Sequence, residues 1–139
     1  MRLLPHAEIL LMMERVGQIS LGDAPSVLTV NSDADPKDER PAVYAWVADD
    51  EILYIGKAGR GVAKRMREHI NGFRNSIRGR SHAEYLAALI ERGRSIALYA
   101  MWPDPVEVNG HWIPSHSAVE DWLIAVADPT PVRNLATRR

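Results

Sequence analysis

Cysteine is absent from the 139 residues, which excludes disulfide bonds, thiolate metal sites and cysteine nucleophiles and fits a cytoplasmic protein. Long apolar runs are lacking as well. The longest, residues 9–13, has five residues, whereas a membrane-spanning helix needs about 20. The N-terminal segment also differs from a signal peptide, because its apolar stretch is short and Glu8 comes early. The chain is therefore expected to cross no membrane.

The remaining composition is that of an ordinary globular domain. Hydrophobic residues make up 46% of the chain and charged residues 25%. This balance excludes global disorder, and the length suits one compact unit rather than two independent cores.

The net charge of -1 conceals a strongly basic segment. Residues 55–80 hold eight Lys or Arg but only one acidic residue, Glu68, whereas the segments on either side are acidic. A basic block in an otherwise neutral domain indicates a local surface for a polyanion. A solvated helix face is the alternative explanation.

Apolar periodicity and helix signals predict a succession of short elements. Pro5 and Gly17 flank a helical pattern, and Ser-x-x-Glu capping boxes at Ser81 and Ser117 predict two helix starts. The expected elements are a helix over 5–16, a short strand over 26–30, a loop over 31–41, a hairpin of strands 42–47 and 52–56, helices over 62–70 and 81–92, a strand over 95–101, a loop over 103–114 and a helix over 117–127.

This order predicts an α+β fold with a small antiparallel sheet flanked by helices. The three clearest strands would form a three-stranded sheet. Residues 1–40 are interpreted as an N-terminal helix and linker, and residues 41–139 as the domain that carries the function.

Several residues that could take part in catalysis occur in a recognisable order. Two tyrosines lie on the paired strands, a basic helix follows, and a lone glutamate begins the late helix. Together they resemble the GIY-YIG nuclease superfamily over residues 41–136, with alanine in place of the first signature glycine. The motif residues are Ala42-Val43-Tyr44, Tyr54-Ile55-Gly56, Lys64-Arg65-x-Arg67-x-His69, Glu120 and Asn134.

The resemblance implies a metal-dependent endonuclease that cuts DNA, double-stranded by expectation, to 5′-phosphate and 3′-hydroxyl ends. A restriction or defence enzyme is the favoured subclass, and repair and mobile-element enzymes are alternatives. The implied catalytic residues are Tyr44, Tyr54, Arg65, His69 and Glu120; Glu120 would bind Mg²⁺ or Mn²⁺; and the nucleic-acid-binding residues would be Lys57, Arg60, Lys64, Arg67, Arg74 and Asn134.

These residue types suit phosphodiester hydrolysis. Arg65 can hold the phosphate bidentately, and Glu120 can bind one hard cation that keeps several waters. Tyr44 would deprotonate the attacking water, with the nearby cationic cluster and the phosphate-bound metal favouring its phenolate, and His69 would relay the proton. Tyr54 would orient water or phosphate.

Each assignment has a structural alternative. The two tyrosines could be ordinary strand aromatics, Glu120 could complete the Ser117 capping box, and Asn134 could only fix backbone near the C-terminus. A catalytically inactive nucleic-acid-binding module and an interaction domain built on the N-terminal helix are the alternative functions.

The apolar run of the N-terminal helix predicts a homodimer. Residues 9–13 would be apolar around nearly the whole helix, and one domain can cover only one side of it. A two-fold interface through this helix would cover the rest. The alternative is that residues 18–30 fold back and cover the helix within one monomer.

Overall fold

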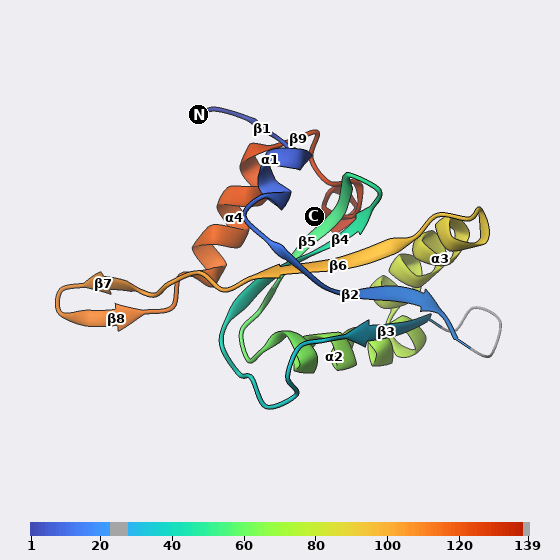
Figure 1. Cartoon of the computed structure of the whole chain (residues 1–139), viewed down its shortest axis with the longest axis horizontal. Helices are drawn as coiled ribbons and strands as arrows, with labels where there is room; N and C mark the ends of the chain where they lie inside the picture. The colour runs from blue at the N-terminus through green and yellow to red at the C-terminus, as the bar shows by residue number, and fades with distance from the viewer. Residues whose placement is uncertain (23–27, 138–139) are drawn as a thin grey trace.

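The computed structural model describes residues 1–22 and 28–137 of the chain (Figure 1). Its elements, in chain order, are β1 (Leu4–Pro5), α1 (His6–Leu10), β2 (Glu14–Leu21), β3 (Leu28–Ser32), β4 (Ala42–Ala48), β5 (Glu51–Ala58), α2 (Val62–Asn75), α3 (Ile77–Glu91), β6 (Ile96–Met101), β7 (Val106–Val108), β8 (His111–Ile113), α4 (His116–Val126), β9 (Ala127–Asp128) and α5 (Val132–Thr137).

The central sheet has five strands, not the expected three, in the order β3-β2-β6-β4-β5. Each neighbouring pair is antiparallel, so the α+β class is as expected. The two additional strands come from residues 1–40, which therefore share one sheet with the rest of the chain. β2 buries Val16 and Ile19, which are three residues apart and so show no simple strand alternation; the register of its pairing with β6 shifts between Arg15 and Gly17.

The N-terminal helix is much shorter than expected. α1 ends at Leu10, and β2 begins at Glu14 and pairs with β6, so a helix over residues 5–16 is wrong. The sheet wins because this pairing buries Val16 and Ile19 against the core. Of the short strand expected over 26–30, residues 28–30 belong to β3, and residues 26 and 27 lie outside the described part of the chain.

The β4–β5 hairpin is as predicted and forms one edge of the sheet. Its register places Tyr44 opposite Gly56 and Trp46 opposite Tyr54, with an irregularity after Trp46. Asp49 makes the turn with a φ of 56°, a conformation that Asp tolerates better than most residues. β5 pairs only with β4 in this sheet, so its other side is an edge.

The sheet separates two layers of side chains. Alternate residues of β4 point to opposite faces, as the pleat requires. α2 and α3 cover one face, and α1 and α4 cover the other (Figure 1). Aromatic residues gather on the α2/α3 face, whose members include Tyr44, Trp46, Tyr54, Phe73 and Leu86, whereas the α1/α4 face is mainly aliphatic, with Val43, Ala45, Val47, Ile52, Ile55 and Leu123.

Neither predicted capping box begins a helix. α3 begins at Ile77, one turn before Ser81, and the Oγ of Ser76 accepts its cap hydrogen bond from the Gly79 N–H at 2.9 Å. α4 begins at His116 after Ser115, so Ser117 lies inside the helix and its side chain caps nothing. No helix in the described ranges is long and apolar enough to cross a membrane.

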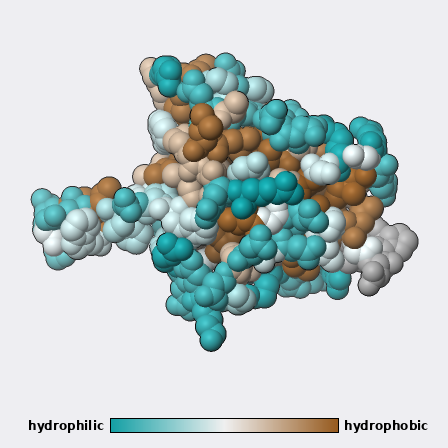
Figure 2. Space-filling model, in the orientation of Figure 1, coloured by the Kyte–Doolittle hydropathy of each residue, from teal (hydrophilic) through white to brown (hydrophobic). Residues whose placement is uncertain are grey.

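The expected loop over residues 103–114 contains a hairpin, β7–β8, which extends away from the body of the molecule (Figures 1 and 2). Asn109 and Gly110 form its turn, both with positive φ, as an Asn-Gly hairpin turn requires. The prolines on either side obscured this signal in the sequence.

Candidate active site

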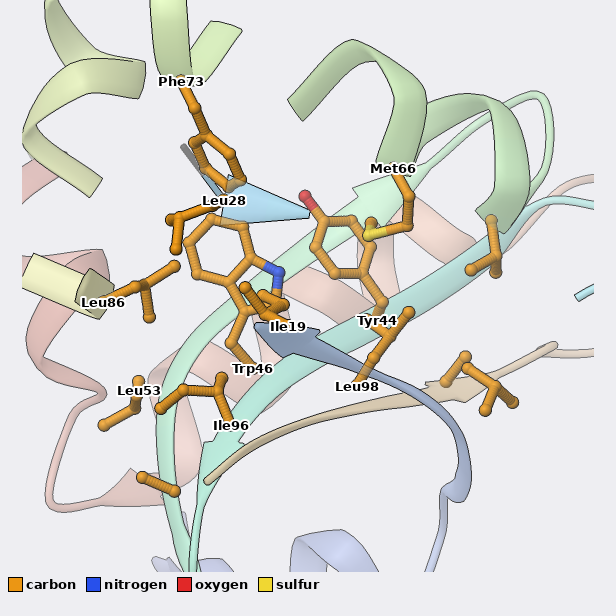
Figure 3. Close-up of a cluster of buried hydrophobic side chains, with 14 of the residues drawn as sticks. Ile19, Leu28, Tyr44, Trp46, Leu53, Met66, Phe73, Leu86, Ile96 and Leu98 are labelled. Atoms are coloured by element: carbon orange, nitrogen blue, oxygen red, sulfur yellow. The ribbon is translucent and has the colours of Figure 1, made fainter. Parts of the chain in front are cut away.

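The candidate site is built around Tyr44, a fully buried residue of β4. Its ring lies beside Trp46 and below the α2 side chains Met66 and Phe73 (Figure 3). Its hydroxyl forms a short hydrogen bond with Nε2 of His69, which α2 supplies. A phenol and an imidazole are thus joined in the interior, one from the sheet and one from the helix above it.

Gly56 makes room for this phenol. It lies opposite Tyr44 in the β4–β5 register, and a Cβ at this position would collide with the Tyr44 hydroxyl and ring. The glycine of the Tyr54-Ile55-Gly56 motif is therefore required by the close approach of the Tyr44 ring to the backbone of β5.

Tyr54 is half-buried and lies between two histidines. Its ring centroid is 6.3 Å from that of His69 and 5.1 Å from that of His82. Trp46 packs against it at 4.6 Å. Tyr54 therefore connects the buried Tyr44–His69 pair to the surface at the edge of the sheet.

Burial raises the pKa of both tyrosines. For Tyr44, burial and the neighbouring Tyr54 raise the pKa well above its usual value, and Arg65 offsets this only in part. Burial also raises the pKa of Tyr54, again against Arg65. In the protein without metal or phosphate, desolvation of the fully buried phenol outweighs the charge of Arg65. The expectation that the cationic cluster and a phosphate-bound metal together favour the Tyr44 phenolate stays a prediction.

His69 is a neutral imidazole. Burial, followed by the positive charge of Arg65 and the proximity of His82, lowers the pKa of His69 to about 3. A neutral ring has one acceptor nitrogen and one donor nitrogen. Nε2 can therefore accept the Tyr44 proton when Nδ1 carries the hydrogen.

Arg65 lies on α2 at the rim of the site, with 36% of its side chain exposed. Its contact with Glu68, at 3.8 Å, is loose and leaves the guanidinium available. A surface hollow of about 200 Å³ adjoins it, lined by Gly59, Arg60, Gly61, Lys64, Arg65 and Glu68. The hollow is suited in size and charge to a phosphate group.

Glu120 approaches the site from the opposite face of the sheet. It lies on α4, and its charge raises the pKa of Tyr44 and of Tyr54, so it is within electrostatic range of both. Burial raises the pKa of Glu120 itself, and Lys57 and Arg65 oppose the rise. The site therefore combines side chains from both layers.

The donor set for a cation is small. Glu120 is half-buried, and no group of three or more His, Asp or Glu residues in the described ranges is arranged to hold a metal. One carboxylate suits Mg²⁺ only where substrate phosphate and water complete the coordination shell. Glu120 fits such a site, and the residues that the structure describes supply no fixed cage.

The basic residues predicted to bind nucleic acid are spread around this site. Arg60 and Lys64 share the hollow with Arg65. Lys57 lies on the α4 side, where its Nζ donates a hydrogen bond to the Ser117 Oγ at 3.3 Å. Arg67 is exposed but two residues from Arg65, so it projects from another side of α2. Arg74 is exposed near the start of α3, where it lines a separate hollow.

Asn134 has a structural position. It is buried, its Oδ1 accepts a hydrogen bond from the Ile55 N–H at 2.8 Å, and its Nδ2 donates to the Ile55 carbonyl at 2.9 Å. These bonds satisfy outward backbone groups on the edge strand β5, as a further strand would. The arrangement favours the backbone-fixing alternative over nucleic-acid binding.

Three residues near the site were not identified from the sequence. His82 is buried against Tyr54 and Trp46, and Arg133 donates to it. His116 lies on α4 four residues before Glu120, and its Nδ1 is buried without a partner in the described residues. The four-residue spacing could have indicated His116. Only tertiary packing brings His82 and Arg133 together.

The fold is similar to that of a known protein. No protein-family model matches the sequence, and no curated protein matches it significantly. Among solved structures, a mutant of bacteriophage T4 EndoII is similar to this chain with a TM-score of 0.65 at 17% identity, covering 86% of this chain and 93% of that one. The restriction endonuclease HPY188I, solved in complex with product DNA, gives a TM-score of 0.49 at 16% identity over 85% of this chain and 75% of that one.

Proposed function

We propose that this chain is a metal-dependent DNA endonuclease of the GIY-YIG type. The proposal is carried by the hydrogen bond between Tyr44 and His69. The charges of Arg65 and Glu120 both act on Tyr44 and on Tyr54. The motif order implies catalytic roles for these same residues. Glu120 comes from α4, on the face of the sheet opposite to α2. The likeness of the fold to T4 EndoII agrees with a nuclease.

The Tyr44–His69 hydrogen bond supplies a route for the proton of the attacking water. Tyr44 is a neutral phenol and His69 a neutral imidazole, so the phenol can pass its proton to Nε2 as it takes one from water. A phosphate bound nearby adds negative charge, which favours the protonated form of His69. The relay needs no free phenolate before substrate binds.

The other residues neutralise and orient the phosphate. Arg65 can donate two parallel N–H bonds to the non-bridging oxygens as charge builds on them. Tyr54 orients water or phosphate beside it. Glu120 would hold Mg²⁺, which would supply positive charge to the leaving 3′-oxygen or the phosphate. Attack of water on phosphorus with cleavage of the bond to the 3′-oxygen would leave 5′-phosphate and 3′-hydroxyl ends.

Plasmid cleavage tests the proposal. Supercoiled plasmid is incubated with the protein and Mg²⁺, Mn²⁺ or excess chelator, and nicked and linear products are separated on a gel. We expect cleavage that requires the cation and is lost in Glu120→Gln. Asp121→Asn is the matched control, because Asp121 is the exposed carboxylate next in the chain.

The outcomes separate this function from its alternative. Folded wild-type protein that binds DNA but does not cut it with either cation would identify an inactive nucleic-acid-binding module. Equal loss of cleavage in Asp121→Asn and Glu120→Gln would contradict Glu120 as the metal ligand.

We also propose that two copies associate through the N-terminal segment. Ile9 is buried, but Leu11 is 86% exposed and Met12 39% exposed. Leu11, Met12 and Trp122 of α4 line a largely apolar hollow, with Arg2 and Glu8 also in its lining, that a second copy could cover. Light scattering at micromolar concentration tests this: a mass near 15.5 kDa contradicts the dimer, and twice that mass supports it.

A further inference from the structure

Arg133 is a half-buried cation whose surroundings hold it in place without neutralising it. Its Nε donates to the His82 Nδ1 at 3.0 Å, and its Nη2 donates to the Ser81 Oγ at 2.9 Å. Its guanidinium also lies over the Tyr85 ring, 5.1 Å from the centroid. Within residues 1–22 and 28–137, no carboxylate forms an ion pair with it.

The three contacts fix the guanidinium through neutral groups. Burial, then the charges of Arg133 and Arg78, lower the pKa of His82 to about 4, so His82 is a neutral acceptor. A guanidinium has five N–H donors, and the described residues use two of them, which leaves donors for a ligand. A fixed, partly desolvated arginine with free donors is suited to bind an oxyanion.

The position of Arg133 relates it to the candidate active site. Tyr54 contacts His69, whose neighbour is Arg65, and also His82, whose neighbours are Arg133 and Arg78. Arg65 and Arg78 both lower the pKa of Tyr54. Two sets of cations therefore lie near Tyr54, and the set that contains Arg65 is the one assigned above to the reacting phosphate.

We infer that Arg133, assisted by Arg78, binds a second phosphate of the same nucleic-acid strand, next to the one that is cut. His82 and Ser81 are positioning residues, which aim the guanidinium and do not touch the substrate. The inference rests on the proposed function, because it requires a polyphosphate backbone to pass over Tyr54. It extends that function by assigning the direction in which the strand leaves the site, from α2 toward α3 and α5.

Equilibrium binding without cleavage tests the inference. A fluorescent DNA duplex is titrated with full-length protein in chelator at several salt concentrations, and anisotropy gives the affinity and its salt dependence. The variants are Arg133→Gln, Ser81→Ala and, as matched control, Arg92→Gln. Arg92 is exposed about 15 Å further along α3 from His82.

Arg133→Gln should weaken binding roughly tenfold, as expected for loss of a charged hydrogen bond. It should also make the slope of log affinity against log salt shallower by about 0.9, the change for one lost duplex phosphate contact. Ser81→Ala should weaken binding by a smaller factor, and Arg92→Gln should match the wild type. Thermal unfolding of each variant shows whether it is folded.

The possible failures are distinguishable. Wild-type protein that does not bind DNA would overturn the proposed function and this site with it. Wild-type binding with an unchanged salt slope in folded Arg133→Gln would overturn the second phosphate site alone. Should Arg133→Gln not fold, Ser81→Ala decides, because Ser81 is exposed and its loss leaves the core intact: unchanged affinity would count against the site.

Discussion

The two faces of the β4–β5 hairpin differ in chemistry although they share one backbone. Toward α1 and α4 the hairpin presents Val43, Ala45 and Val47, and this layer is aliphatic. Toward α2 and α3 it presents Tyr44 and Trp46. The aliphatic face needs no partners beyond close packing, whereas each polar atom buried on the aromatic face must find a hydrogen bond or remain unsatisfied.

Most of the polar groups buried on the aromatic face have hydrogen-bond partners. The Tyr44 hydroxyl and His69 satisfy each other, and His82 accepts from Arg133. The indole N–H of Trp46 is buried without a partner among the described residues. Burial shifts the pKa values of the titratable groups on this face, and such shifts are typical of functional sites. The contrast assigns stability to one face and chemistry to the other, and it can be tested by substitution.

The largest effect is expected on the aliphatic face. Ile52→Ala removes a side chain that is 1% exposed and should lower the free energy of unfolding by about 2–5 kcal/mol through lost burial and a cavity. Urea denaturation measures the loss. Cleavage per folded molecule should be unchanged at low temperature, and a large loss of activity in folded protein would contradict the division between the faces.

Arg65→Ala, in contrast, should reduce cleavage and leave stability nearly unchanged. Loss of the phosphate-binding guanidinium should reduce cleavage roughly 10²- to 10³-fold, the usual effect of losing one transition-state donor. Stability should change by less than about 0.5 kcal/mol, because the side chain is partly exposed and its ion pair is loose. Arg67→Ala and Arg60→Ala are the comparisons, assayed on the same plasmid. An inactive Arg67→Ala beside an active Arg65→Ala would show that the helix register is assigned wrongly.

Asn134→Ala tests the two hydrogen bonds that Asn134 forms with the backbone of the edge strand β5. It leaves the Ile55 N–H and carbonyl without their buried partner and should cost about 1–3 kcal/mol of stability. Urea denaturation measures the loss. Leu135→Ala, at an exposed neighbouring residue, should change the free energy of unfolding little. Weaker DNA binding with unchanged stability would instead support Asn134 as a nucleic-acid contact.

The histidines of the aromatic face predict a smaller effect that grows with acidity. The folded pKa values of His69 and His82 are lowered to about 3 and about 4, whereas the unfolded histidines titrate near 6.5. The unfolded state therefore binds more protons below pH 6.5, and stability is full above that pH. It should fall by up to about 1.4 kcal/mol per pH unit for each histidine as the pH drops toward the folded values.

Unfolding curves at pH 7, 6 and 5 measure this dependence. His82→Phe should flatten it, because one titrating group is removed from an apolar setting. His111→Asn, at an exposed residue of β8, should leave it as in the wild type. An equal pH dependence in all three proteins would show that His82 does not contribute to acid stability.

The sequence predicted the β4–β5 hairpin because local signals agree there. Alternating strand formers on both sides of an Asp-Asp turn leave few alternatives. The resemblance in motif order also named the residues of the candidate site, and the structure joins two of them, Tyr44 and His69, by a hydrogen bond. Helix ends were harder: Ser81 and Ser117 carry capping-box patterns, but Ser76 and packing place each helix start one to four residues earlier.

Other features depended on tertiary structure alone. The residues of β2 continue an apolar run that also suits a helix, and only pairing with β6 decides for a strand. The neutral state of Tyr44 likewise could not be inferred from a basic segment, because burial, which outweighs Arg65, is a property of the folded chain. The sequence by itself determined which chemical groups are available and the hairpin that presents two of them. The fold decided which groups meet and in which charge state, since both depend on long-range contacts and the water that those contacts exclude.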